Sequence, residues 1–196
     1  GDNSNTPSTT VTIPAGGSVE LSSFWPPAGM NLAGAIRVTS LATDAGGKPL
    51  PLTARSVTRA RRASPAGEVL GPLIEGLPAS SLLAMGETGL IPHLEAGQSV
   101  DSSFRSNVLL LSTNAAEETE LTLTLIDRDG ESRGEKTIAL GRLAQTQVND
   151  VAGYFRYVTC LRGCPSGSPV PEPIEVRVRI VRGGPVAAAG ILIENE

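Results

Sequence analysis

The sequence of 196 residues has few aromatic residues, one histidine and only two cysteines. Aromatic residues make up 3% of the chain, whereas sites for sugars and single-stranded nucleic acids commonly use flat aromatic rings for stacking. The net charge is −4 at pH 7, and a polyanionic partner is normally met by a basic surface. The composition therefore predicts no nucleic-acid partner and disfavours a sugar site built on stacking.

The sequence also has no long hydrophobic run. Its best apolar run, "VAAAGILI" at 186–193, has eight residues, whereas a membrane-spanning helix needs about 20. We therefore expect no membrane insertion. The chain begins with Gly1 and Asp2, without a Met or a signal-peptide pattern, so we predict a processed or excised product. A removed signal peptide would explain this start.

The two cysteines, Cys160 and Cys164, lie in the Gly/Pro/Ser-rich segment "CLRGCPSGSP". Three interpretations compete: a small disulfide ring, half of a zinc site, or a redox pair. A structural zinc needs about four Cys or His ligands, and His93 is the only other candidate. Redox pairs typically have the spacing C-x-x-C at a helix start. We predict a structural disulfide, with two free thiols as the alternative, and an oxidised pair would place the protein outside the cytoplasm.

Alternation of apolar and polar residues dominates the sequence and predicts β-strands. The segment "ELTLTLID" (120–127) alternates Leu with Thr and Glu, and "IEVRVRIV" (174–181) alternates Ile and Val with Glu and Arg. Each pattern predicts a strand with one buried face and one solvated face. Further strands are expected at 18–21, 35–40, 52–59, 106–113, 135–140, 144–148 and 186–194.

Helical periodicity is limited to 78–85 and 148–155, where Asn149 or Asp150 is a candidate N-cap. Glycine-containing segments predict hairpin turns, because glycine adopts the positive φ that tight turns need. These segments are "DRDGES" (127–132), "VRGGPV" (181–186) and "PAGG" (14–17). Many short strands with such turns indicate an all-β protein made of antiparallel sandwiches.

An internal repeat relates residues 9–61 to residues 135–195. In both copies a strand, a Gly turn, a second strand, a short bulky segment and a long loop precede two more strands. The second copy is preceded by two further strands that the first copy lacks, and 64–94 connects the copies. We therefore predict two antiparallel β-sandwich (Ig-like) modules in tandem. The first, with the connector, covers 1–90 and lacks its initial strands; the second covers 91–196.

Several segments together resemble the tandem β-sandwich modules of large secreted proteins of environmental bacteria. They are "SFRSNVLLLSTNAAEETELTLTLIDRDG", "TIALG", "QVNDV" and "IENE", with "LPASSLL" and "GLIPHL" between the copies. The resemblance covers most of the chain and implies an extracellular, repetitive and structural protein. It implies no known activity, and the missing first pair of strands departs from its pattern.

Two clusters of side chains are candidate binding sites. Asp127, Asp129 and Glu131 in "DRDGES" offer carboxylate oxygens to Ca²⁺, but a full calcium loop has further spaced ligands, so we prefer a hairpin turn. A basic cluster in 55–62 is a candidate contact for an anionic polysaccharide or an acidic partner, together with Trp25. The alternative is a solvated strand that protects a sheet edge. The basic cluster consists of Arg55, Arg59, Arg61 and Arg62.

No catalytic residues are predicted. His93 would have to carry any Ser-His-Asp or Cys-His chemistry, and the sequence has neither a G-x-S-x-G motif nor a phosphate-binding loop. We therefore expect no enzyme activity, no metal and no cofactor.

The preferred hypothesis is a secreted structural subunit of a cell-surface or filamentous assembly. A sandwich short of two strands exposes an edge and an apolar face, which a strand from a neighbouring chain can cover in donor-strand complementation. Head-to-tail self-association, or contact with neighbouring modules of the same chain, would follow. The alternatives are an adhesin or carbohydrate- or protein-binding module of a larger exported protein, an enzyme with a dispersed site, and a stable piece of a longer scaffold.

Overall fold

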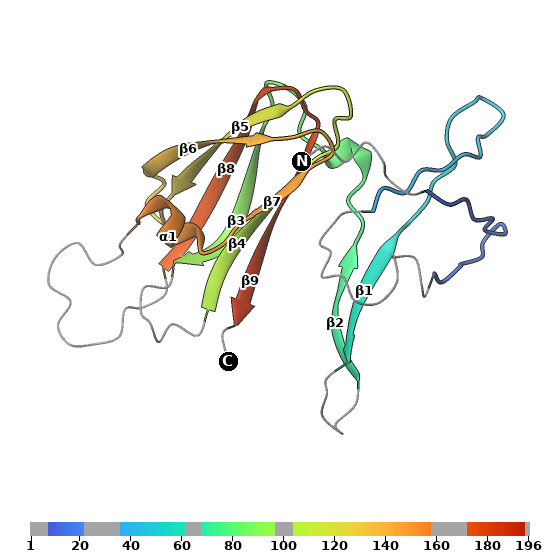
Figure 1. Ribbon diagram of the computed structural model, residues 1–196, viewed down its shortest axis with the longest axis horizontal. Helices are drawn as coiled ribbons and strands as arrows, with labels where there is room; N and C mark the ends of the chain where they lie inside the picture. The colour runs from blue at the N-terminus through green and yellow to red at the C-terminus, as the bar shows by residue number, and fades with distance from the viewer. Residues whose placement is uncertain (1–7, 22–35, 62–67, 97–103, 158–171, 195–196) are drawn as a thin grey trace, which may run out of the picture.

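The computed structural model describes residues 8–21, 36–61, 68–96, 104–157 and 172–194, which form mostly β-structure (Figure 1). Two short helices are present, the 3-10 helix η1 (Ala79–Ser81) and the α-helix α1 (Val151–Phe155). The strands in chain order are β1 (Arg55–Arg61), β2 (Glu68–Glu75), β3 (Thr88–Ala96), β4 (Phe104–Ser112), β5 (Thr119–Ile126), β6 (Ser132–Leu140), β7 (Gln145–Val148), β8 (Glu172–Arg182) and β9 (Val186–Glu194).

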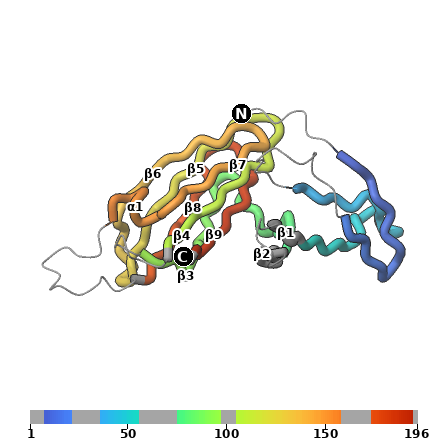
Figure 2. The backbone as a smooth tube through the Cα atoms, turned by 60° about the horizontal axis from the view of Figure 1, so that its bottom comes forward, coloured from blue at the N-terminus to red at the C-terminus, as the bar shows by residue number. Residues whose placement is uncertain are grey.

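Two antiparallel sheets form a sandwich-like body over residues 88–194. The four-stranded sheet has the order β3-β8-β5-β6, and the three-stranded sheet has the order β7-β4-β9. The two sheets lie face to face, and α1 closes one end between them (Figures 1 and 2). Strands β1 and β2 pair only with each other and form a hairpin to one side of this body. The chain is therefore all-β, with two packed sheets and a separate hairpin.

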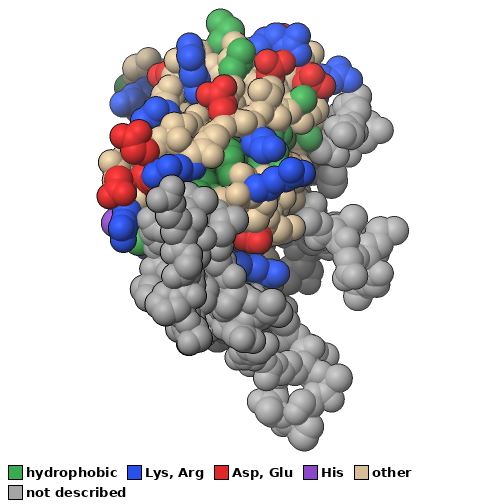
Figure 3. Space-filling view, turned by 90° about the vertical axis from the view of Figure 1, so that its left-hand side faces the viewer, with side chains coloured by type: hydrophobic (Ala, Val, Ile, Leu, Met, Phe, Trp, Pro, Cys, Tyr) green, Lys and Arg blue, Asp and Glu red, His purple; other side chains and the backbone are tan. Residues whose placement is uncertain are grey.

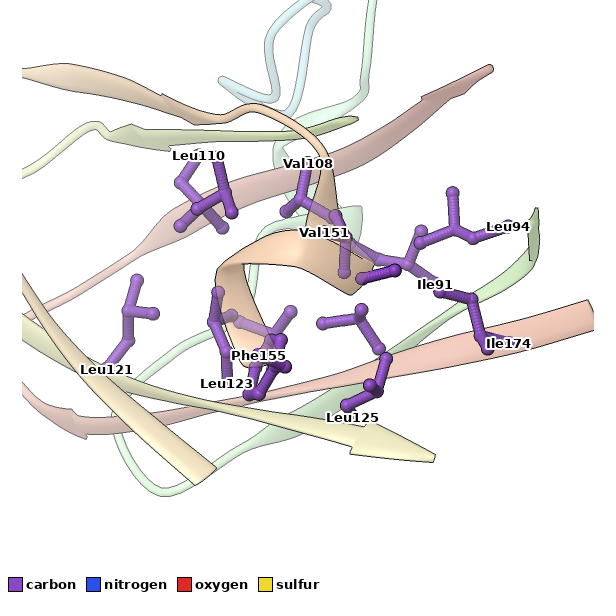
Figure 4. Close-up of a cluster of buried hydrophobic side chains, with 14 of the residues drawn as sticks. Ile91, Leu94, Val108, Leu110, Leu121, Leu123, Leu125, Val151, Phe155 and Ile174 are labelled. Atoms are coloured by element: carbon purple, nitrogen blue, oxygen red, sulfur yellow. The ribbon is translucent and has the colours of Figure 1, made fainter. Parts of the chain in front are cut away.

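One aliphatic core joins the two sheets (Figure 4). The alternation in β5 buries Leu121, Leu123 and Leu125 completely, while the intervening residues are half-buried. The alternation in β8 does the same for four residues, Ile174, Val176, Val178 and Ile180. Burial of one such side chain contributes about 1.5–3 kcal/mol. This core stabilises the sandwich-like body with few aromatic rings; Phe155 of α1 is one buried member.

Strand β3 contains a β-bulge where it passes Pro92 and His93. The pairing with β8 shifts register between Ile91 and Leu94, and His93 has a φ of 59°. Beyond the bulge, Ser106 of β4 accepts a hydrogen bond from the Glu95 N–H at 2.7 Å and donates one to the Glu95 carbonyl at 2.9 Å. A bulge bends its strand locally. After the bulge, the C-terminal end of β3 contacts the opposite sheet, where Glu95 pairs with the side chain of Ser106.

Helix α1 lies within the predicted segment 148–155, and the structure selects one of the two candidate N-caps. Asp150 is the N-cap, and its carboxylate accepts a hydrogen bond from Gly153 N–H at 3.2 Å. Asp150 itself has a φ of 47°, and its N–H donates to Oδ1 of the fully buried Asn107 at 3.0 Å. The cap and the buried amide together anchor α1 to β4.

Strands β4 to β9 confirm the predicted alternation, apart from shifts at their ends. The structure differs from the predictions in the strands before β4 and in the turn at 181–186. Residues 18–21 and 36–40 form no strand, whereas β2 and β3 arise in the predicted connector. Strand β3 spans the position of the expected module boundary at residue 91. The turn at 181–186 is also not a hairpin, because β8 and β9 belong to different sheets; Gly183 and Gly184 do adopt the predicted positive φ.

Candidate assembly surfaces

The predicted basic cluster begins on β1. Arg55 forms an exposed ion pair with Glu75 of β2 at 3.1 Å. The backbones of Arg59 and Arg61 lie in the same strand, opposite Leu70 and Glu68. The structure does not describe the side chains of Arg59 and Arg61. Four further candidate residues lie wholly outside the described part of the chain: Arg62, Trp25, Cys160 and Cys164. The hypotheses on a ligand contact and on a disulfide therefore stay predictions.

The candidate calcium residues form the turn between β5 and β6. The Gly130 N–H donates to the Asp127 carbonyl at 3.0 Å, which closes the turn. Asp127 Oδ1 accepts hydrogen bonds from the N–H groups of Asp129 and Glu131 at 3.0 and 2.9 Å. Its Oδ2 accepts from the Arg133 guanidinium. Both carboxylate oxygens of Asp127 thus have protein partners, and a cation would have to displace Arg133.

These contacts also set the protonation of Asp127. Burial raises the pKa of the carboxyl, and the hydrogen bonds from Glu131 N–H, Arg133 and Asp129 N–H lower it by more, so the pKa of Asp127 lies below its ordinary value. The pairing with Asp127 likewise raises the pKa of Arg133. The pair is therefore ionised at neutral pH and fixes the β5–β6 turn.

His93 lies exposed in the bulge of β3. Among the residues that the structure describes, no group of three His, Cys, Asp or Glu side chains is arranged to hold a metal ion. Buried polar side chains are few and pair mainly within the fold: Ser112 and Thr119 hydrogen-bond at 3.1 Å across the two sheets. Thr119 also accepts from Gly184 N–H at 3.1 Å.

The most distinctive surface feature is an apolar N-terminal segment with the pattern of a strand. Residues 9–13 are an unbroken run of β-branched side chains, the residue types most enriched in strands. In the described residues this run belongs to no sheet, and Val11 and Ile13 are 43% and 39% exposed. After the turn at Pro14–Gly17, Val19 and Leu21 are equally exposed. The segment is strand-like in sequence and unpaired in structure.

Three of the four edge strands of the sandwich-like body carry features that discourage further pairing. Strand β3 has Pro92 and its bulge, and β7 has only four residues. Strand β6 carries Arg133, Glu135 and Lys136. The side of the molecule that faces left in Figure 1 shows basic and acidic side chains interspersed (Figure 3).

The fourth edge strand, β9, has none of these features. From 187 to 193 its sequence is "AAAGILI", without proline or charge, and its register with β4 is regular. At its start, Val186 exchanges two hydrogen bonds with Leu83, at 2.8 and 2.9 Å. Beyond this bridge no described residue pairs with the outer edge of β9.

The solvent face of the three-stranded sheet next to this edge is also apolar. Val108 and Leu110 of β4 point into the core, so Leu109 and Leu111 point outward. Their register partners on β9 are Ala189 and Ala187. On the same face Ile191 is 38% exposed. An apolar face and an unprotected edge therefore meet on β9.

The sequence of 187–193 already indicates an unprotected edge, because edge strands usually carry charge or proline and this segment has neither. The pattern alone could not show that β9 is an edge strand, since a central strand in a buried sheet has the same composition.

Comparison with protein-family models, with curated proteins and with solved structures gives no match. Within the described ranges, no helix has the length and apolar character needed to cross a membrane.

Proposed function

We propose that this protein is a non-enzymatic structural subunit of an extracellular or cell-surface assembly, in which strands from one copy complete sheets of another. The observation that carries the proposal is the unpaired segment at 9–13, whose strand pattern has no partner in the described chain. An exposed strand-like segment normally gains stability by pairing its backbone groups and covering its apolar side chains.

Two contributions favour pairing of this segment in an assembly, and one opposes it. Val11 and Ile13 keep about two fifths of their surface exposed, and covering apolar surface contributes roughly 25 cal/mol per Å². A strand added to an existing sheet also pairs backbone donors and acceptors that a lone segment leaves to water. Ordering the segment opposes these gains, at about 1–2 kcal/mol for each residue fixed.

The finer architecture belongs to the same proposal. We assign the sandwich-like body to the second of two Ig-like modules in tandem, and the residues before β3 to a first module that acquires a complete sheet only in the assembly. The packed four- and three-stranded sheets of the body support this assignment. The hairpin β1–β2, which pairs with no other strand of the described chain, is consistent with an incomplete first module.

Sedimentation velocity over a wide concentration range tests the proposed function, with negative-stain electron microscopy of the same samples. Growth of species larger than the 20.2 kDa chain with increasing concentration is expected, and regular filaments would be its fullest form. A chain that sediments as a monomer at every concentration would contradict assembly as the function.

A further inference from the structure

We propose that the free edge of β9 is the acceptor of the assembly and that residues 9–13 of a second copy are the donor strand. This inference rests on the function proposed above and specifies which two surfaces meet. The donor adds a fourth strand to the three-stranded sheet, next to β9.

The backbone geometry of β9 identifies the groups that would bind the donor. In an antiparallel ladder, N–H and C=O groups of successive residues point to alternate sides of the strand. Val186 exchanges its hydrogen bonds with Leu83 on the outer side. By alternation, the N–H and C=O groups of Ala188, Gly190 and Leu192 also point outward. No described residue pairs with them, so three residues offer a regular set of donors and acceptors.

The side chains along this edge favour an apolar donor strand. Leu192 lies opposite Ser106, which is buried, yet Leu192 remains 44% exposed because nothing in the described chain flanks β9 there. Ile191 on the other face of the strand is 38% exposed. A strand placed beside β9 would cover apolar surface on both faces of the sheet at once.

The segment 9–13 matches this edge in length and chemistry. It has five residues, and the outward groups of β9 span the five residues from 188 to 192. Val11 and Ile13 lie on one face of an extended strand and Thr10 and Thr12 on the other. Both the segment and β9 from 187 to 193 are uncharged, so pairing buries no unpaired charge. Pro14 lacks an N–H and would end the added strand.

The main competing occupant is β9 of another copy, paired about a two-fold axis. Such a contact places Gly190 near the centre, where it offers no side chain, and leaves Val11 and Ile13 exposed in both copies. A donor strand from 9–13 covers the outer edge of β9 and the side chains of Val11 and Ile13 in a single contact. We therefore favour the N-terminal donor.

The test compares the full chain with variants of acceptor and donor by sedimentation equilibrium. L192P removes one outward N–H of β9 and leaves the residues that bond to β4 unchanged; L192V is the matched control that keeps this N–H. V11K/I13K places charge on the donor, and V38K is the matched control on another exposed segment, where Val38 is 52% exposed. Thermal unfolding verifies that each variant folds. Should L192P unfold, L192K replaces it, because it keeps the backbone and charges the edge.

The expected result is that L192P and V11K/I13K each raise the dissociation constant at least about tenfold, while L192V and V38K stay within about twofold of the unmodified chain. Backbone hydrogen exchange at Ala188, Gly190 and Leu192 should slow as the concentration rises.

The other outcomes separate the acceptor, the donor and the function. Assembly that L192P and L192K leave unchanged overturns the β9 acceptor and leaves the proposed function standing. Assembly weakened by L192P but not by V11K/I13K overturns the donor. A monomer with slow exchange at Ala188, Gly190 and Leu192 means that the same chain covers β9, which overturns the second copy as occupant and also the proposed function. A monomer with fast exchange there overturns both the inference and the proposed function.

Discussion

At the scale of single residues, the ion pair of Asp127 and Arg133 makes the stability of the sandwich-like body depend on pH. The pKa of Asp127 in the folded protein lies below its ordinary value of about 3.9. A carboxyl group with a depressed pKa contributes stability that is present above its unfolded pKa and is lost as the pH falls through its folded pKa. The contribution is therefore complete at neutral pH, begins to fall near pH 4, and is gone only below the folded pKa of Asp127.

The substitution D127N tests this contribution. We expect D127N to lower the melting temperature at pH 7, because its amide would present a donor to the Arg133 guanidinium. The difference from the unmodified chain should shrink as the pH falls from about 5 to about 2. Thermal unfolding followed by circular dichroism over this range measures it. D129N changes the same charge at an exposed side chain of the same turn and should have little effect; an equal effect of both would contradict the role of the pair.

The same geometry yields a prediction about calcium. Because both carboxylate oxygens of Asp127 already have partners, we expect millimolar Ca²⁺ to leave the melting temperature unchanged. A ligand that binds only the folded state raises the melting temperature, so a clear rise with Ca²⁺ that D127N abolishes would revive the calcium site at Asp127, Asp129 and Glu131.

Asn107 is a second residue whose role the structure explains. Its Oδ1 accepts the Asp150 N–H at the start of α1, while its Nδ2 has no partner among the described residues. N107A should lower the free energy of unfolding by about 1–3 kcal/mol, because the Asp150 N–H loses its acceptor in a partly buried position. Urea unfolding measures this change. N149A, an exposed neighbour, should stay within about 0.5 kcal/mol; an equally small effect of N107A would show that water replaces the amide.

At the scale of elements, the close contact of β9 with β3 depends on Gly190. A Cβ at this position would lie 2.6 Å from Ile91 Cγ2 and 2.8 Å from Leu94 Cδ2, both in the core. We expect G190A to lower the free energy of unfolding by about 1–3 kcal/mol, the usual cost of overfilling a packed core. A189V adds volume to the neighbouring residue on the solvent face and serves as the control. Unchanged stability of G190A in urea would mean that the two side chains move aside without cost.

The elements also show how far the sequence predicts the fold. Strands such as β5 and β8 were predictable because one face packs on the core, so alternation in the sequence follows burial directly. Strands β2 and β3 were not, because the glycines and prolines of 64–94 are typical of a connector, yet proline is tolerated at edges and bulges, as at Pro72 and Pro92. The crossing between β8 and β9 was not predictable either, because a glycine turn has the same local sequence within one sheet or between two.

Of the two surfaces in the proposed contact, one is predictable from the sequence and the other is not. The strand-like character of the proposed donor at 9–13 follows from local composition, because β-branched residues favour extended backbone wherever they lie. The acceptor does not, because an edge is a property of the whole sheet: β9 becomes one only through the order β7-β4-β9. Three-dimensional strand order was therefore needed to connect two segments at opposite ends of the sequence.

At the scale of the whole molecule, the proposed contact joins different surfaces on each copy. Such a heterologous contact leaves a free donor at one end and a free acceptor at the other, so it continues into an open chain unless the rotation closes a ring.

Mixing a variant with a blocked donor and a variant with a blocked acceptor distinguishes this arrangement from a symmetric one. V11K/I13K keeps only its acceptor and L192P keeps only its donor, so each should be monomeric alone and an equimolar mixture should form 1:1 heterodimers and nothing larger. A symmetric β9–β9 contact would instead give homodimers of V11K/I13K and leave L192P monomeric in the mixture. Native mass spectrometry resolves these species when one variant carries an isotope label.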